Sequence, residues 1–210
     1  MTGSGRRGQL RLSGGRRLQS PRGNQTRPTT GLVRAAVINM LADRLRECHW
    51  LELCSGSGVM SCEAIERGAQ RVVAIERDRG TAAICRINLM ATASGQRTAP
   101  HIEVIQSDLR RWLNRGRPEA DPGFDLVYFD PPYEAELYLT GLEALRHGNW
   151  LRQGALVICE HASNRAPGIP EAWWMRDQRR YGNSSVLILS LRERCRDGID
   201  SRRPQTDPAG

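Results

Sequence analysis

The chain has 210 residues, of which 39% are hydrophobic and 26% are charged, a composition typical of a single folded domain with or without an extension. No apolar run approaches the roughly 18 residues of a membrane-spanning helix, and the N-terminus lacks the hydrophobic segment of a secretion signal, so we expect a cytoplasmic protein. The six cysteines and four histidines are scattered without a Cys-x-x-Cys pair, which argues against a bound metal.

The positive charge is concentrated at one end of the chain. The net charge is +8, and the first 42 residues contain eight arginines and no acidic residue. The remainder is therefore neutral, with 31 − 8 = 23 basic residues against 23 acidic ones. Such an N-terminal arm suits the phosphates of a polyanion, but it also suits a solvated tail or an organellar transit peptide.

Beyond the arm, the hydrophobic pattern alternates between helix and strand. Thr30 is a plausible N-cap for a helix over 31–45, whose apolar residues are spaced to bury one face. Five apolar runs of strand length follow, at 50–54, 71–75, 102–106, 124–129 and 155–159. Helical patterns separate most of these runs, for example 59–67 and 137–145. Because consecutive parallel strands need crossover connections, the alternation predicts an α/β fold with a mostly parallel sheet.

The C-terminal part follows a different pattern. The runs 173–181 and 184–191 are separated only by Gly182-Asn183, which predicts an antiparallel hairpin at one edge of the sheet. From 192 onward the chain is polar, and we expect a disordered tail. We therefore divide the chain into a basic arm (1–29), one domain (30–191) and a tail (192–210).

The loop after the first strand is rich in small residues. Glu52 lies in the strand, and Ser55-Gly56-Ser57-Gly58 leads from it into the next helix. The glycines allow a ligand to approach the backbone, and the helix start offers free N–H groups, although an ordinary strand-to-helix turn has the same pattern. The third glycine of a dinucleotide motif is replaced by Ser61, which argues against a nicotinamide cofactor.

Acidic residues end the second strand and follow the third. Glu76 comes 20 residues after Gly56, where a carboxylate can accept hydrogen bonds from ribose hydroxyls. Ser107-Asp108 follows the third strand, and Asp108 could accept a hydrogen bond from an adenine amine or could cap the next helix. With the glycine loop, these residues predict a pocket for a nucleoside.

The fourth strand runs directly into Asp130-Pro131-Pro132-Tyr133. The two prolines restrict the backbone and remove two hydrogen-bond donors, so the turn is rigid. Such a turn can hold the Asp130 carboxylate and the Pro131 carbonyl as fixed acceptors beside the Tyr133 ring. Two acceptors and an aromatic face suit a planar nucleobase that bears an amine.

These motifs resemble those of the bacterial small-subunit (16S) ribosomal RNA guanine-N2 methyltransferases. The match runs from about residue 10 to 191, in the order Arg27-Pro28-Thr29, Val33-Arg34, Asn39, Gly56-Ser57-Gly58, Glu63-Ala64, Arg67-Gly68-Ala69, Asp130 to Tyr133 and Tyr181-Gly182. The chain departs from the usual pattern at four positions: Ala35 replaces a glutamate, Glu52 an aspartate, Cys54 a phenylalanine and Ser55 an alanine.

The resemblance implies a Rossmann-like class I methyltransferase with a seven-stranded sheet, and S-adenosyl-L-methionine as cofactor. It implies that the cofactor is bound by Glu52, Ser55, Gly56, Ser57, Gly58, Glu76, Ser107 and Asp108. The implied catalytic residues are Asp130, Pro131, Pro132 and Tyr133. They would hold the N2 amine of a guanine flipped out of its stack.

The resemblance also implies a ribosomal RNA substrate within the 30S subunit or an assembly intermediate. Arg27, Arg34 and Asn39 are the expected RNA-binding residues, although Arg34 could be an ordinary surface charge of its helix. We expect a monomer without membrane association. Two other functions stay open: an amino-methyltransferase of DNA or another RNA, and a non-catalytic RNA-binding protein. A nicotinamide-dependent dehydrogenase is a more distant alternative.

Overall fold

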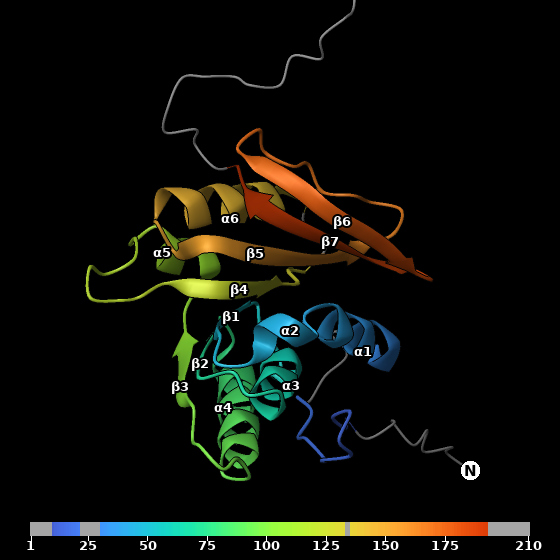
Figure 1. Cartoon of the computed structure of the whole chain (residues 1–210), viewed down its shortest axis with the longest axis vertical. Helices are drawn as coiled ribbons and strands as arrows, with labels where there is room; N and C mark the ends of the chain where they lie inside the picture. Colours follow the sequence, from blue (N-terminus) through green and yellow to red (C-terminus); the bar gives the residue numbers. More distant parts are fainter. Residues whose placement is uncertain (1–9, 22–29, 133–134, 193–210) are drawn as a thin grey trace, which may run out of the picture.

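The computed structural model describes residues 10–21, 30–132 and 135–192, with only the backbone described at 135–136. Seven strands form one sheet: β1 (His49–Leu53), β2 (Arg71–Glu76), β3 (His101–Gln106), β4 (Phe124–Phe129), β5 (Leu151–Ala162), β6 (Trp173–Tyr181) and β7 (Ser184–Leu191). The helices are α1 (Gly31–Met40), α2 (Ala42–Leu45), α3 (Val59–Glu66), α4 (Arg79–Ala93), α5 (Leu109–Leu113) and α6 (Ala135–His147). Figure 1 shows their arrangement.

The strand order is β3-β2-β1-β4-β5-β7-β6, and the first five strands are parallel. Strand β7 pairs antiparallel with both β5 and β6, so the C-terminal hairpin forms one edge of the sheet. The predicted α/β fold is thereby confirmed. The chain runs outward from β1 to β3 and then returns to place β4 beside β1, which makes the gap between β1 and β4 the topological switch point.

The strand register brings three loops together. Leu53, the last residue of β1, pairs with Ile75 of β2 on one side and Phe129 of β4 on the other. Neighbouring strands lie about 4.8 Å apart. The residues that follow these strands, including Cys54, therefore share one edge of the sheet.

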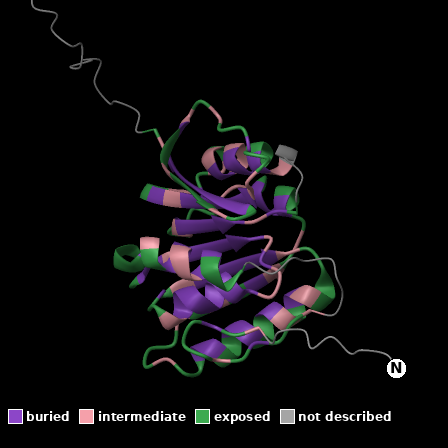
Figure 2. Cartoon of the chain, turned by 90° about the vertical axis from the view of Figure 1, so that its right-hand side faces the viewer, coloured by how far each residue is buried: buried purple, intermediate pink, exposed green. Residues whose placement is uncertain are grey.

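Hydrophobic side chains cover both faces of the sheet. On one face α1, α3 and α4 pack through residues such as Val37, Met60 and Leu89. On the other face α5 and α6 contribute residues such as Trp112 and Leu142. Figure 2 shows that the central strands are buried, while exposed residues lie on the outer sides of the helices. Among the described helices, none is long and apolar enough to span a membrane.

Two predicted elements differ in extent from the observed ones. The helix expected over 31–45 is divided into α1 and α2 at Leu41, whose backbone leaves helical geometry (φ −99°, ψ 4°). Strand β5 is longer than the apolar run at 155–159, because exposed residues before Gly154 and the buried polar pair Glu160 and His161 also belong to it. An apolar run marks only the part of a strand that hydrophobic residues bury.

Part of the expected basic arm packs onto the domain. Residues 10–18 form a small hairpin in which Arg11 and Arg17 face each other in an antiparallel bridge. Leu12 and Leu18 on its other side are buried in the same core cluster as α1, α3 and α4. The hairpin is therefore amphipathic, with leucines inward and exposed arginines outward.

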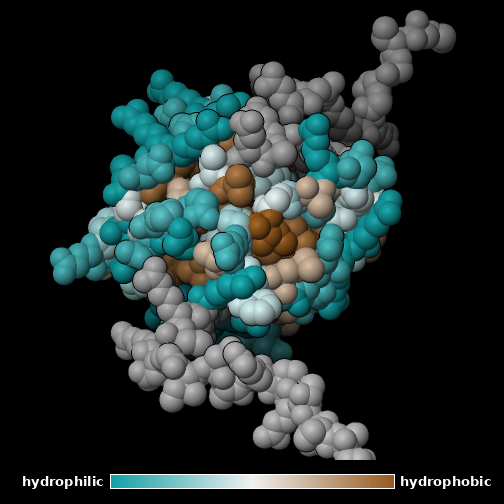
Figure 3. Space-filling model, turned by 90° about the horizontal axis from the view of Figure 1, so that it is seen from above, coloured by the Kyte–Doolittle hydropathy of each residue, from teal (hydrophilic) through white to brown (hydrophobic). Residues whose placement is uncertain are grey.

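The edge strand β6 carries exposed hydrophobic residues. Trp174 and Met175 are each 51% exposed, and the Arg192 guanidinium lies 4.6 Å from the Trp174 ring centroid. Figure 3 views this side of the molecule, where hydrophobic atoms gather among hydrophilic ones. Trp173, the neighbour of Trp174, is instead buried in the core cluster of the α5–α6 face.

Candidate active site

The loop after β1 is a tight turn built on positive backbone angles. Cys54, Gly56 and Gly58 all have positive φ, at 59°, 53° and 73°. Two backbone hydrogen bonds close the turn: the Ser55 amide donates to the Ile75 carbonyl at 2.9 Å, and the Gly58 amide donates to the Ser55 carbonyl at 2.8 Å. The loop is thus attached to the end of β2 before the chain enters α3.

The two glycines of the loop have opposite surroundings. A Cβ atom at Gly58 would lie 2.5 Å from Leu89 Cδ1 and 2.6 Å from Cys85 Sγ, because the loop rests directly on α4. A Cβ atom at Gly56 would meet no described atom within 4 Å. Gly58 is needed for packing, whereas Gly56 leaves open space beside the backbone of the loop.

Glu76 is held at the end of β2 by two backbone amides. Its Oε2 accepts from Gly56 N at 2.9 Å, and its Oε1 accepts from Asp78 N at 2.9 Å. Each carboxylate oxygen has a further lone pair, so the fixed side chain can still accept hydrogen bonds from a ligand. The expected pairing of the glycine loop with Glu76 is therefore present as a direct contact.

Ser107 and Asp108 lie at the next strand end along the same edge. The Ser107 amide donates to the Glu76 carbonyl at 3.0 Å, which continues the sheet by one residue. Asp108 is exposed and caps α5, its Oδ1 accepting from Arg111 N at 3.0 Å. Capping uses one carboxylate oxygen, so the cap and a ligand contact are compatible.

Glu52 lies beneath the loop. Its side chain is buried, and Oε2 accepts from both the amide, at 2.8 Å, and the hydroxyl of Ser61 in α3. Burial raises the pKa of Glu52 to about 7, although the Ser61 hydrogen bonds act in the opposite direction. Glu52 therefore fixes the first turn of α3, directly after the glycine loop.

Asp130 follows β4 directly, next to the glycine loop across the β1–β4 gap. Burial and the negative charges of Glu160 and Glu52 raise its pKa well above the ordinary value. Pro131 is buried and Pro132 is exposed, so the Pro-Pro turn leads the chain from the core to the surface. Tyr133 lies outside the described residues.

Glu160 is a site residue that the sequence analysis missed. It is buried near the end of β5 and accepts a hydrogen bond from the Tyr128 hydroxyl of β4, while its carbonyl accepts one from the Tyr138 hydroxyl of α6. The sequence did contain a signal for it, because Glu160 directly follows the apolar run 155–159. A charged residue at the end of a buried strand can itself be buried beside a site.

The charges at this edge of the sheet act on one central thiol. The pKa of Cys54 is raised to about 12, first by burial and then by the carboxylates of Glu76, Asp130 and Asp108. The thiol is therefore protonated and unreactive at neutral pH. Cys54 follows β1, and the three carboxylates lie at the ends of β2, β4 and β3. The ends of these four strands therefore form one acidic site.

The two expected RNA-binding residues that the structure describes, Arg34 and Asn39, differ in exposure. Arg34 is buried, with its Nε 3.0 Å from Glu63 Oε1 and one terminal nitrogen donating to the Arg11 carbonyl at 2.6 Å. Its guanidinium is used inside the protein rather than at an RNA-facing surface. Asn39 is exposed on α1, and Arg27 lies outside the described residues.

A parallel sheet with an antiparallel C-terminal hairpin, and with a glycine loop and an acidic turn at its switch point, defines the class I methyltransferase fold. A family model described as Conserved hypothetical protein 95 matches residues 8–190. The chain belongs to this family, which confirms the resemblance based on the motifs.

Named relatives and solved structures agree with this assignment. The chain is 28% identical over 174 residues to Ribosomal RNA small subunit methyltransferase D of Haemophilus influenzae, covering 83% of this chain and 88% of the relative. The structure named "Putative methyltransferase yhhF from Escherichia coli" has a TM-score of 0.72 at 28% identity, covering 88% of this chain and 98% of that one. At 15% identity, the structure of SMU.776 complexed with SAH shares the fold, with a TM-score of 0.56 over 74% of this chain and 48% of that one.

Proposed function

We propose that this protein transfers a methyl group from S-adenosyl-L-methionine to the exocyclic N2 amine of a guanine in small-subunit (16S) ribosomal RNA. The observation that carries the proposal is the meeting of a nucleoside-type loop with a rigid Asp-Pro turn at the β1–β4 gap. The name of the Haemophilus influenzae relative supports a ribosomal RNA substrate. The SAH complex of SMU.776 supports the cofactor for this fold.

The residues at the loop fit this cofactor. Gly56 offers open space beside a partly exposed backbone, as a cradle for a bound molecule requires. The Glu76 carboxylate is fixed where it can accept from ribose hydroxyls, and the Asp108 carboxylate and Ser107 lie at the next strand end for the adenine. Ser55 and Ser57 would line the cofactor as part of this turn, whose shape is fixed by the Ser55 backbone hydrogen bonds, and Glu52 holds the start of α3. When bound, S-adenosyl-L-methionine supplies a methyl group on a positively charged sulfur.

The Asp130-Pro131 turn would orient the target amine. The Asp130 carboxylate and the Pro131 carbonyl provide two acceptors for the two amine hydrogens of guanine. Accepting both hydrogens favours a tetrahedral nitrogen and directs its lone pair toward the methyl group. Tyr133, expected from its position in the motif, would stack on the flipped base. Most of the rate acceleration would come from positioning and fixed dipoles.

The proton balance needs no strong base. Once the nitrogen carries the new methyl group it is positively charged and acidic, and it releases one hydrogen as a proton. Asp130 or water accepts this proton. The raised pKa of Asp130 makes its carboxylate a better proton acceptor than an ordinary aspartate.

RNA would be held by the basic N-terminal region. The outer face of the hairpin at 10–18 presents Arg11 and Arg17, and more arginines follow in the arm, including Arg27. Asn39 is exposed on α1 and available to an RNA ligand. Arg34 would act indirectly, by holding the hairpin through the Arg11 carbonyl. The 30S subunit or its assembly intermediate is the proposed partner, and the protein would act as a monomer.

The experiment compares nucleic acid substrates. Radiolabelled S-adenosyl-L-methionine is incubated with the protein and with 30S particles, 50S particles, free 16S RNA or duplex DNA, each from cells that lack the endogenous activity. Label confined to 16S RNA supports the proposal. Label in DNA or in 50S RNA would show that the proposed substrate is wrong. Cofactor binding without transfer to any of these nucleic acids would favour a non-catalytic binding protein.

A further inference from the structure

Asn88 of α4 joins two segments that are far apart in the sequence. Its side chain is buried, and its Nδ2 donates to the carbonyl of Ser57 in the glycine loop at 2.9 Å. The same Nδ2 donates to the Gln19 carbonyl at 3.0 Å, and Oδ1 accepts from the Gln19 amide at 2.8 Å. One amide group therefore holds both the cofactor loop and the N-terminal segment 10–21.

The Asn88 side chain has no spare hydrogen-bond donor. A side-chain amide has two N–H donors, and both of them are used here, one for each segment. If either segment moves away, a donor of the buried Asn88 side chain is left without its acceptor, which costs free energy. The positions of Ser57 and Gln19 are therefore energetically connected through Asn88.

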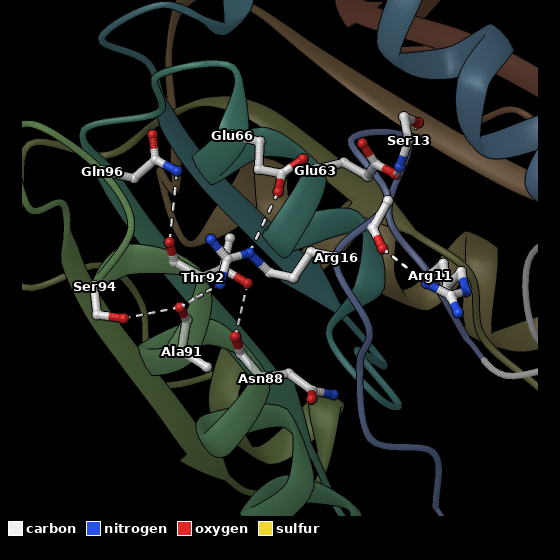
Figure 4. Close-up of polar contacts among 11 residues, drawn as sticks. Arg11, Ser13, Arg16, Glu63, Glu66, Asn88, Ala91, Thr92, Ser94 and Gln96 are labelled. Atoms are coloured by element: carbon white, nitrogen blue, oxygen red, sulfur yellow. Dashed lines mark hydrogen bonds and ion pairs between the residues drawn. The ribbon is translucent and has the colours of Figure 1, made fainter.

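Both segments are seated on the adjacent helices α3 and α4. The loop rests on α4 at Gly58, within contact of Leu89. The N-terminal segment is anchored to α3 by Ser13, whose amide and hydroxyl donate to Glu63 Oε1 at 2.8 and 3.0 Å. Figure 4 shows this side of α4, with Asn88 on the helix and Ser13 opposite Glu63. Neither segment can shift far without affecting the contacts around the other.

We infer that Asn88 is a positioning residue that couples cofactor binding to the order of the N-terminal segment. A ligand that fixes the glycine loop also fixes the Ser57 carbonyl, which holds Asn88 in the orientation that binds Gln19. By reciprocity, RNA that holds the N-terminal segment favours the loop conformation that binds the cofactor. This inference rests on the proposed function, because it takes S-adenosyl-L-methionine as the ligand of the loop.

The direct test is hydrogen exchange of the N-terminal segment with and without S-adenosylhomocysteine, the product form of the cofactor. We expect bound S-adenosylhomocysteine to slow exchange of the Gln19 amide, although the ligand itself binds at the glycine loop. Unchanged exchange at Gln19 with demonstrated binding would overturn the inference and leave the proposed function intact. Absence of binding in calorimetry would instead remove the proposed function, and the inference with it.

Two variants of Asn88 sharpen the test. Asn88→Asp keeps an acceptor for the Gln19 amide but places an oxygen against two carbonyls, and Asn88→Leu removes every side-chain hydrogen bond. We expect each to weaken S-adenosylhomocysteine binding about tenfold, as the loss of one or two buried hydrogen bonds predicts, and to abolish the ligand-dependent protection of Gln19.

Thr92→Val is the matched control. Thr92 is equally buried on α4, and its hydroxyl donates to the Asn88 backbone carbonyl at 2.8 Å rather than to the loop or the N-terminal segment. It should keep wild-type affinity and the protection of Gln19. Equal losses in Thr92→Val and the Asn88 variants would show a general effect of destabilising α4 and contradict the proposed coupling.

Discussion

The Glu76 carboxylate at the end of β2 accepts a hydrogen bond from the backbone amide of Gly56, in the loop after β1. The contact fixes the turn whose open side faces the proposed cofactor. It also explains why the two glycines of the loop are not equivalent, since Gly58 alone is packed against α4.

Alanine substitutions should separate these two roles. Gly56→Ala costs about 1–2 kcal/mol of stability, because φ is positive and the methyl group meets no described atom. Gly58→Ala costs about 3 kcal/mol or more, because its methyl group also overlaps Leu89 and Cys85. Gly168→Ala, at an open position without positive φ, is the control.

The same variants should differ in ligand affinity. Gly56→Ala is expected to weaken S-adenosylhomocysteine binding by at least tenfold despite its modest effect on folding, because its methyl group occupies ligand space. Urea unfolding and calorimetry measure the two quantities. Unchanged affinity in Gly56→Ala would show that the ligand does not bind beside Gly56.

The pH dependence of methyl transfer should report on Asp130. The reaction uses the Asp130 carboxylate, so the rate rises with pH through its raised pKa. Glu160 contributes to that raised pKa as a neighbouring negative charge. Glu160→Gln removes the charge and keeps an acceptor for the Tyr128 hydroxyl, so the rising limb should move to lower pH.

The control for this profile is Glu143→Gln. Glu143 pairs with Arg146 on α6 and does not contribute to the raised pKa of Asp130. Its pH–rate profile should match that of the wild type. A rising limb that stays in place in Glu160→Gln would exclude Asp130 as the group that controls the rate.

The buried Glu52 should make stability depend on pH. Its pKa is raised from 4.5 to about 7 in the folded protein, so the folded state holds the proton more tightly than the unfolded state. This advantage is present below about pH 4.5 and is lost as pH rises through about 7. Glu52→Gln has no proton to lose and keeps an acceptor for Ser61.

The stability of Glu52→Gln relative to wild type should therefore increase with pH. The increase between pH 4.5 and 8 is of order 3 kcal/mol at most, from the size of the pKa change. Urea unfolding at a series of pH values measures it. A difference between the two proteins that is constant across this range would show that Glu52 has an ordinary pKa.

Arg34 should behave as a structural residue. Removing it leaves Glu63, whose side chain is fully buried, without a cation, and its Oε2 already lacks a partner among the described residues. Arg34→Met should cost about 3–5 kcal/mol in urea unfolding, and adding Glu63→Met should recover part of the loss.

The exposed pair formed by Arg152 and Asp125 supplies the comparison for Arg34. Arg152→Met should cost about 0–1 kcal/mol, because solvent screens the pair. If Arg34→Met folds as stably as Arg152→Met but loses RNA affinity, Arg34 contacts RNA directly and the buried pair is not formed in solution.

The sequence predicted the strand ends well because apolar runs and turn residues are local signals. The run at 124–129 corresponds to β4 without change, and both strands of the C-terminal hairpin have the expected bounds. The position of Glu76 beside the glycine loop followed from parallel strands ending at one edge. The sequence therefore predicted which strand ends meet at this edge, and Glu76 does contact the glycine loop there.

Contacts between distant segments could not be predicted in this way. Arg34 and Glu63 are 29 positions apart, and Asn88 and Gln19 are 69 apart, so no local pattern brings them together. Leu12 and Leu18 occur among arginines and glycines, and composition therefore marked the whole region as an arm. Glu160 was missed because it lies in β5 and Asp130 follows β4, 30 positions earlier, so no local pattern connects the two residues.

The central claim is that Asp130 directs methyl transfer to the guanine N2 amine. The measurement is mass spectrometry of nucleosides from 16S RNA, after 30S particles are treated with S-adenosyl-L-methionine and wild-type, Asp130→Asn or Asp125→Asn protein. Asp125, the second residue of β4, lies at the other end of the same strand and serves as the control. We predict N2-methylguanosine with the wild-type and Asp125→Asn proteins, and its loss with Asp130→Asn. Another methylated nucleoside, or full activity of Asp130→Asn, would contradict the account.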